Sequence, residues 1–203
     1  MKTFNFDEKK AQQAIELLLE SFGEDLNREG IQRTPARVAK FYKEALSGNA
    51  VDPLKLISAH YTTENHEEII LVKDVSFYSL CEHHLLPFLG KAHVAYIPQK
   101  DKIIGVSKLV RLIEVFANRL QLQERLTKQV ADTVMQSIWP HGVMIVVEAE
   151  HLCMTMCGVK KPGSKMITSA IRGIFLKDVR TRAEVMSLLK GLLICFAVVN
   201  YVS

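Results

Sequence analysis

The chain has 203 residues, 48% of them hydrophobic, which is enough to bury the core of one sizeable domain. Its 26 Lys and Arg against 22 Asp and Glu give a formal net charge of +4. This is too small for the basic surface of a nucleic-acid-binding protein, and it agrees better with a phosphorylated small molecule as partner. The N-terminus, MKTFNFDEKK, lacks the apolar stretch of a secretory signal, so we expect a cytoplasmic protein.

Two helices are expected in the N-terminal part of the chain. Residues 7–22 carry apolar side chains at helical spacing behind Asp7, which can cap the helix. Further on, Thr34 can cap a second helix, Pro35 suits its first turn and Gly48 can end it. Both helices are amphipathic, so we expect them to pack on or beside the rest of the protein.

The pattern changes near residue 68 to the β-branched and aromatic alternation of strands. Strands and helices then follow one another in an order that predicts an α+β fold with antiparallel pairing rather than a series of parallel βαβ units. The expected strands are 67–75, 91–98, 142–154 and 164–175, and the expected helices are 107–120, 123–139 and one that starts near Val179.

We divide the chain into an N-terminal helical region (1–67), a core with the candidate chemistry (68–185) and an apolar C-terminal tail (186–203). From Gly191 the tail is apolar over most of its length but shorter than the roughly 20 residues that span a bilayer. A membrane segment is therefore not expected. We favour a buried final strand or helix, with a weak membrane or partner contact as the alternative.

The stretch CEHH at residues 81–84 is the first with recognisable chemistry. Cys81 and His84 stand three apart, so one turn can direct both side chains to the same side. If the strand from residue 142 stays extended, its period of two places His151 and Cys153 on one face. Two thiolates and one imidazole, Cys81, His84 and Cys153, are ligands that zinc prefers, and a set of three leaves a position for water.

The other two histidines of these motifs, His83 and His151, titrate in the working pH range and can transfer protons beside such a metal. The alternative is ordinary: a cysteine is commonly a small buried apolar residue, and a histidine often satisfies a hydrogen bond in a core. Spacing alone leaves both interpretations open.

Four segments in this order, CEHHLLPFLGKAHVAYIP, IGVSKLVRL, QLQERLTKQV and EAEHLCMTM, resemble GTP cyclohydrolase I over residues 34–175. The resemblance implies the tunnelling fold, with an antiparallel sheet and helices on one side, assembled into a ring that is typically a decamer with active sites at subunit interfaces. It also implies zinc-dependent attack of water on C8 of GTP, which gives formate and 7,8-dihydroneopterin triphosphate for folate or pterin biosynthesis.

By position, the resemblance assigns a role to each matching residue. It implies zinc ligands at Cys81, His84 and Cys153, and acid/base histidines at His83 and His151. It implies that Ser107 acts in the rearrangement and in phosphate contact, that Gln123 is an orienting residue near the reacting ring, and that Glu124 accepts the two N–H groups of the guanine edge. The implied triphosphate contacts are Lys108, Arg111, Arg37 and Lys40.

One position departs from the family pattern, because Cys157 stands in the segment MTMCGV where the family has a phosphate-binding arginine. A thiol cannot replace a bidentate guanidinium. Three interpretations remain open: Lys160, Lys161 or Arg172 compensates, the substrate is less phosphorylated, or the chain is a weakened copy that binds purines or pterins as a regulator. Cys157 could also serve as a second thiolate or oxidise with Cys153.

Overall fold

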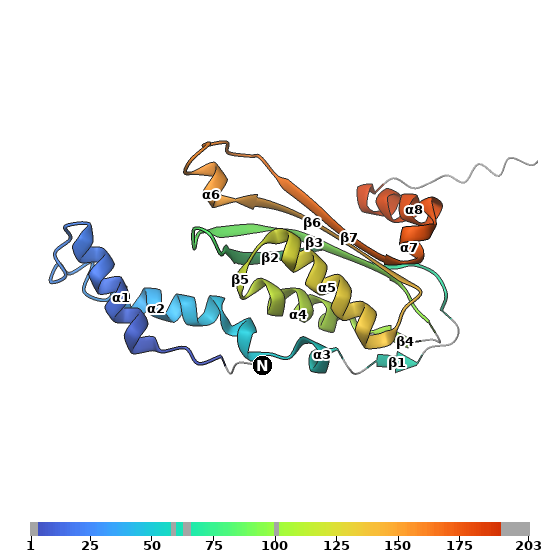
Figure 1. Cartoon of the computed structure of the whole chain (residues 1–203), viewed down its shortest axis with the longest axis horizontal. Helices are drawn as coiled ribbons and strands as arrows, with labels where there is room; N and C mark the ends of the chain where they lie inside the picture. Colours follow the sequence, from blue (N-terminus) through green and yellow to red (C-terminus); the bar gives the residue numbers. More distant parts are fainter. Residues whose placement is uncertain (1–3, 58–59, 63–65, 100–101, 192–203) are drawn as a thin grey trace, which may run out of the picture.

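The computed structural model describes residues 4–57, 60–62, 66–99 and 102–191 (Figure 1). Its main sheet has the strand order β5-β2-β3-β6-β7, in which β2, β3, β6 and β7 pair antiparallel and the short β5 pairs parallel with β2. The expected α+β class is therefore confirmed. The strands are β2 (Ile70–Cys81), β3 (Pro87–Ile97), β5 (Leu120–Gln121), β6 (Gly142–His151) and β7 (Met166–Gly173), and a separate pair joins β1 (His60–Thr62) to β4 (Lys102–Ile104).

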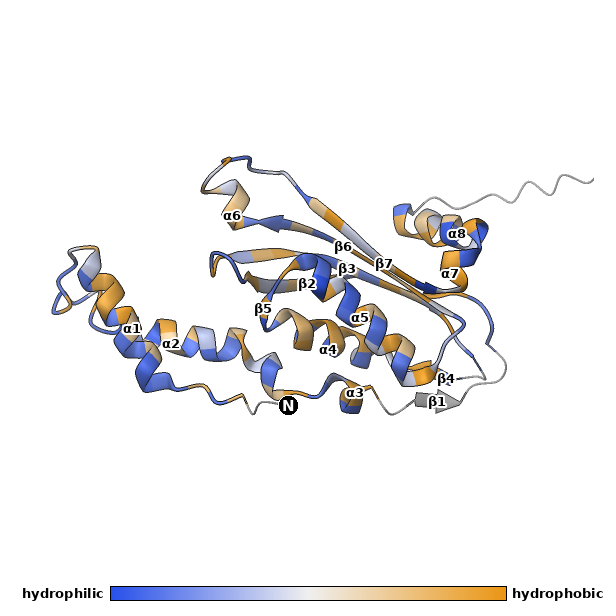
Figure 2. Cartoon of the chain, viewed as in Figure 1, coloured by the Kyte–Doolittle hydropathy of each residue, from blue (hydrophilic) through white to orange (hydrophobic). Residues whose placement is uncertain are grey.

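Two long helices, α4 (Val106–Ala117) and α5 (Gln123–Ile138), cover one face of this sheet (Figure 1). Their apolar sides pack against the alternate strand residues Ala92, Val94 and Tyr96, which belong to the main core. Figure 2 shows this as hydrophobic colouring along α4 and a hydrophilic outer side on α5. At one end of the opposite face, α7 (Ile174–Lys177) and α8 (Val179–Lys190) close a second, smaller core around Ala95, Met144, Phe175 and Val185.

The N-terminal helices form a hairpin that extends away from the sheet (Figure 1). In α1 (Glu8–Ser21) the side chain of Asp7 accepts the N–H of Lys10 at 3.0 Å, so the expected cap is confirmed. The expected cap of α2 (Thr34–Ala45) is wrong by one residue: Arg33 is the N-cap, and the hydroxyl of Thr34 donates back to the carbonyl of Gly30. The short helices η1 (Ser47–Ala50) and α3 (Pro53–Leu56) lead to the core, and Gly48 lies inside η1 instead of ending α2.

A second correction concerns the strand that carries His151. The expectation of an extended chain through residue 154 is wrong, since β6 ends at His151 and the short helix α6 (Leu152–Thr155) follows. His151 and Cys153 are therefore not two residues of one strand face. They lie on either side of the junction between β6 and α6, and Figure 1 shows α6 at one end of the sheet.

Gly90 sets the contact between β3 and β6. A Cβ atom at this position would lie 1.9 Å from the carbonyl oxygen of Glu148, so only glycine permits the strands to approach so closely. In the resulting register Gly90 pairs with Ala149, and two residues further on Phe88 pairs with His151. The pairing of β3 with β6 thus positions the histidine at the end of the sheet.

The apolar tail lies outside the described residues from residue 192 onward, so the expectation of a buried final element is not tested. Within the described ranges, none of the helices has both the length and the apolar character needed to cross a membrane.

Candidate functional site

The candidate site begins in the turn between β2 and β3. The N–H of Cys81 donates to Leu86 O at 2.9 Å, and the N–H of Leu85 donates to Cys81 O at 2.8 Å. Leu85 has a φ of 56°, which reverses the chain tightly at this point. As a result the Sγ of Cys81 lies 3.8 Å from the Nδ1 of His84.

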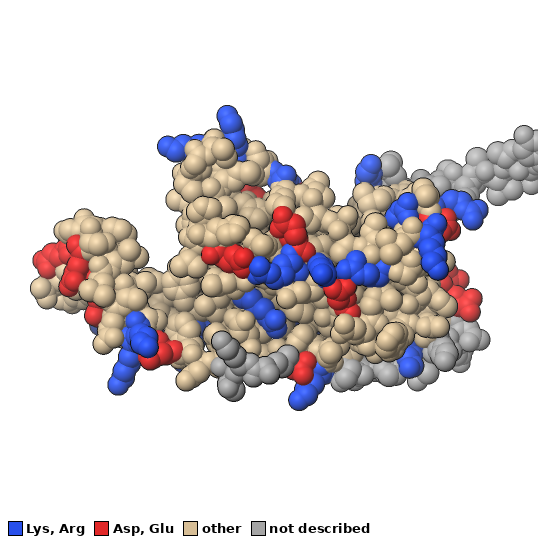
Figure 3. Space-filling view, viewed as in Figure 1, with Lys and Arg blue, Asp and Glu red and all other residues tan. Residues whose placement is uncertain are grey.

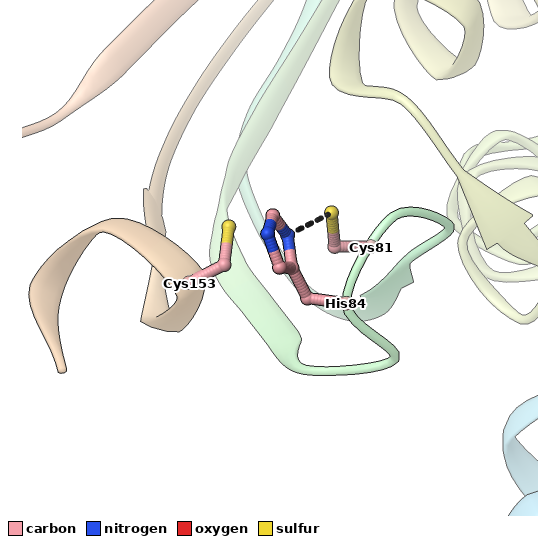
Figure 4. Close-up of side chains that lie close together, drawn as sticks. All are labelled: Cys81, His84 and Cys153. Carbon is pink, nitrogen blue, oxygen red and sulfur yellow. Dashed lines mark hydrogen bonds between the residues drawn. The ribbon is translucent and has the colours of Figure 1, made fainter. Parts of the chain in front are cut away.

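Cys153 reaches the same place from α6 (Figure 4). One ligand atom each from Cys81, His84 and Cys153 lies within 4.8 Å of the other two, so the three side chains form a group that could hold a metal ion. Cys81 is buried, Cys153 is half-buried and His84 is exposed, so the group opens to solvent on the histidine side.

The chemistry of these donors fits zinc. In a tetrahedral zinc site a thiolate sulfur and an imidazole nitrogen lie about 3.6 Å apart, close to the 3.8 Å between Cys81 and His84. Burial and the neighbouring thiol of Cys81 raise the pKa of Cys153, because a second negative charge is unfavourable there. A divalent cation would remove that penalty, since it stabilises both thiolates.

His151 lies beside this group and is held on two sides. Its ring stacks on Phe88 with the centroids 4.6 Å apart and the planes 1° from parallel. Its Nε2 lies 2.8 Å from Oε1 of Gln123, the first residue of α5. Burial lowers the pKa of His151, and the carboxylate of Glu124 partly offsets this.

The contacts of Gln123 determine which proton His151 keeps. The buried Nε2 of Gln123 donates to the carbonyl oxygens of Val147 and Met166, both at 3.0 Å. Oε1 is therefore the atom that faces His151, and an amide oxygen can only accept. Consequently Nε2 of His151 carries a hydrogen in either protonation state, and Nδ1 is the nitrogen that gains and loses a proton.

Two threonines support the amide in this orientation. Thr127 donates to the backbone carbonyl of Gln123 at 2.7 Å, so its oxygen accepts the hydroxyl hydrogen of Thr168, also at 2.7 Å. The oxygen of Thr168 in turn lies 3.1 Å from Nε2 of Gln123. Both hydroxyl hydrogens thus have assigned acceptors, so the free lone pairs of Thr168 face Gln123, and a rotated amide that placed its oxygen there would be unfavourable.

His83 and Glu124 lie at the rim. The exposed ring of His83 stands at 89° to that of the candidate ligand His84, with the centroids 6.2 Å apart. Glu124 is exposed in the first turn of α5 and lines a hollow of about 440 Å³ together with Thr168 and Arg172. A carboxylate is favourable in the first turn of a helix, so the position by itself does not require a ligand.

The remaining candidate residues lie elsewhere in the chain. Ser107, Lys108 and Arg111 lie in the first half of α4, whereas it is the last residue of that helix, Ala117, that approaches the site by accepting the hydroxyl of Ser79. Ten residues of helix separate Ser107 from Ala117, or about 15 Å. Arg37 and Lys40 are exposed on α2 in the N-terminal hairpin. One chain thus brings together the metal group, His83, His151, Gln123 and Glu124, but not the five other candidates.

Cys157 lies just after α6 and its Sγ donates to the carbonyl oxygen of Cys153 at 3.0 Å. The expected relation through a regular strand is wrong, because the segment turns after α6. Lys160 and Lys161 are exposed in the loop that follows. Arg172 is bound instead to Asp132, with Nε at 2.8 Å and Nη2 at 2.7 Å from Oδ1.

Several residues of the site were not identified from the sequence. Thr127 had a usable signal, since it lies four residues after Gln123 on the same face of a helix. Phe88 and Thr168 had none, because their partners are distant in the chain and depend on the sheet register.

Comparison with known proteins agrees with this geometry. Residues 11–190 match the family model described as GTP cyclohydrolase I. The chain is 58% identical over 186 residues to a GTP cyclohydrolase 1 of Pelotomaculum thermopropionicum, covering 92% of this chain and 98% of the relative. It is 58% identical over 183 residues to that of Carboxydothermus hydrogenoformans (90% and 95% covered) and 55% identical over 183 residues to that of Clostridioides difficile (90% and 96%).

Proposed function

The chain belongs to the GTP cyclohydrolase I family of hydrolases, and from this premise we propose that it opens the imidazole ring of GTP at C8 with a zinc ion held by Cys81, His84 and Cys153. The products are formate and 7,8-dihydroneopterin triphosphate. The observation that carries the proposal is the convergence of two thiols and one imidazole from segments about 70 positions apart within 4.8 Å. A bound zinc ion supplies a water nucleophile of lowered pKa at neutral pH.

The protein's own side chains bind the base and move protons. Glu124 accepts the N1–H and exocyclic N–H groups of guanine, which selects against adenine because that base would leave the carboxylate unpaired. Nδ1 of His151 exchanges the proton, since its Nε2–H is committed to Gln123. His83, exposed at the rim, is the second proton-transfer group.

We further propose that the active site forms between subunits of a homo-oligomeric ring. The metal group lies at one end of the α4 and α5 layer, whereas Ser107, Lys108 and Arg111 lie in the other half of α4. Arg37 and Lys40 lie on the projecting hairpin, which is suited to reach a neighbour (Figure 1). A second copy of the chain would bring these triphosphate contacts to the metal group of the first.

The test is to incubate the zinc-loaded protein with GTP and measure formate together with pterin fluorescence. We expect stoichiometric release of formate, loss of turnover on chelation and recovery when zinc is returned. Binding of zinc and GTP without formate would contradict the proposal and favour the regulatory interpretation suggested by Cys157.

A further inference from the structure

A pair of charged side chains, which was not identified from the sequence, connects the metal-binding turn to the start of α5. Glu82 lies in the metal-binding turn between Cys81 and His83, and Arg125 is the third residue of α5, directly after Glu124. The guanidinium of Arg125 binds the carboxylate of Glu82 in a bidentate manner: Nη1 donates to Oε2, and Nη2 donates to Oε1 at 2.9 Å. Such a fork fixes the orientation of both groups as well as their distance.

The backbone already connects these segments at the short pairing of β5 with β2. The N–H of Glu82 donates to Gln121 O at 3.1 Å, where β5 pairs with the end of β2. Helix α5 begins two residues later with Gln123, whose buried side chain anchors it to β6 and β7, whereas the next residue, Glu124, is exposed. The bidentate contact between Glu82 and Arg125 adds a direct side-chain contact between the metal-binding turn and the residue next to Glu124.

The charge of Arg125 is otherwise poorly placed. A cation in the first turn of a helix is opposed by the positive end of the helix dipole, and the carboxylate of Glu82 offsets this. The two side chains are 41% and 29% exposed, and ion pairs with that exposure contribute little to overall stability. Figure 3 shows basic and acidic side chains close together on the face where α5 lies. Overall stability is therefore a weak reason for this arrangement.

We propose that Glu82 and Arg125 are positioning residues, which hold the guanine-binding carboxylate of Glu124 at a fixed place relative to the metal group of Cys81, His84 and Cys153. The inference rests on the proposed function for the role of Glu124. Neither residue needs to contact the substrate. Their effect is to let one purine reach Glu124 with its base edge and the metal group with C8 at the same time.

The test uses Arg125→Lys, which keeps the charge but loses the fork, with Arg28→Lys as the matched control. Arg28 also pairs with a glutamate, Glu24 at 2.7 Å, but in the N-terminal hairpin. Hydrogen exchange followed by mass spectrometry should show faster exchange in residues 82–86 and 123–127 of the Arg125 variant and no change there in the control. Zinc content and melting temperature should stay near those of the unmodified protein.

The functional measurement compares GTP with inosine triphosphate, which lacks the exocyclic amine that Glu124 binds. A misplaced Glu124 should lower kcat/KM for GTP by about ten- to a hundredfold and lower the preference for GTP over inosine triphosphate with it. Glu82→Gln should act in the same way. The double variant should lose no more than the worse single variant, because both changes break one contact.

The outcomes separate the two proposals. Unchanged exchange in both segments would overturn the positioning role, and so would an equal loss for the two nucleotides. If the unmodified protein releases no formate from GTP, the proposed function fails. In that case hydrogen exchange still decides whether Glu82 and Arg125 fix the metal-binding turn against α5. Binding titrations with GTP and inosine triphosphate then decide whether the two residues set the base preference.

Discussion

The ring of His151 lies flat on the ring of Phe88, with 4.6 Å between the centroids and 1° between the planes. The two residues are register partners across β3 and β6, so the sheet itself sets this contact. Phe88 is fully buried and also packs edge-on against Phe77 at 5.9 Å. His151 can therefore move neither toward the core nor sideways without breaking either the stack or its hydrogen bond to Gln123.

Replacing Gln123 with leucine keeps His151 but removes the group that orients it, so the variant measures how much the orientation of His151 contributes to activity. The variant removes the acceptor of the Nε2 proton and leaves the carbonyl oxygens of Val147 and Met166 without this donor. We expect the free energy of unfolding to fall by about 1–3 kcal/mol and the rate of formate release to fall by about 10²- to 10⁴-fold. Chemical denaturation and single-turnover kinetics measure the two effects.

Thr168→Val provides the graded control for that experiment. It removes one of the three acceptors around Nε2 of Gln123 and keeps the other two, so the amide retains its orientation. We expect a loss of activity of less than about tenfold, corresponding to about one neutral hydrogen bond. A Thr168 variant as inactive as the Gln123 variant would contradict the assigned hydrogen-bond chain.

Metal binding should depend on Cys153 and not on Cys157. Serine at position 153 replaces a soft ligand within the group of three, so zinc content measured by atomic absorption should fall to near zero and turnover should be lost. Cys157→Ser removes only a thiol that donates to the carbonyl of Cys153, so zinc content should stay at one ion per chain. Equal loss of zinc in both variants would show that Cys157 is itself a ligand.

The ligand group shows how far sequence reasoning reaches in this protein. The three-residue spacing in CEHH predicted two ligands on one side of a turn. The structure agrees, since Sγ of Cys81 lies 3.8 Å from Nδ1 of His84. The route to Cys153 was wrong, because the chain leaves the strand conformation after His151 and enters α6. Periodicity describes a regular element well, but it carries no signal for the residue at which the element ends.

Residues that orient the site lay further beyond the reach of the sequence. Glu82 and Arg125 stand 43 positions apart in the chain. The sequence around each of them is that of an ordinary surface residue. Their contact depends on the pairing of β5 with the end of β2, which involves only two residues of each strand. So short a pairing leaves no periodic pattern in the sequence. The strands and long helices were predictable because their apolar periodicity extends over many residues.

His93 should make stability depend on pH. The N–H of Asp74, at a bulge with a φ of 62°, donates to Nδ1 of His93 at 3.1 Å, which requires that nitrogen to be unprotonated. Burial lowers the pKa of His93, and the nearby carboxylates of Asp74 and Glu148 only partly offset this. The contribution to stability is therefore fully present above the unfolded value of about 6.5 and is lost as the pH falls through the lowered folded pKa.

The measurement is the melting temperature between pH 7.5 and 4.5 for the protein and for His93→Asn. Asparagine offers an oxygen in place of Nδ1 and does not titrate. We expect the difference between the two curves to change below about pH 6.5, with the unmodified protein losing more stability on acidification. Parallel curves over the whole range would show that His93 stays neutral in both states or contributes nothing.

A site shared between subunits predicts that two inactive variants restore each other. His151→Ala destroys the half-site that carries the metal group, and Arg111→Ala destroys the half on α4. If the halves come from different chains, random mixing of the two variants in equal amounts gives both intact halves at about one quarter of the sites. Formate release should then recover to about that fraction of the unmodified rate, once the subunits have been dissociated and reassembled together.

The control mixes Ser107→Ala with Arg111→Ala, two changes in the same half. Every site then retains one defect on α4 whichever chains meet, so the mixture should recover no more activity than its components. If His151→Ala and Arg111→Ala also failed to restore each other, although mixed assemblies formed, both halves would have to come from a single chain. The first half of α4 would then have to move to the metal group, past a helix end that Ser79 holds by a 2.7 Å hydrogen bond to Ala117.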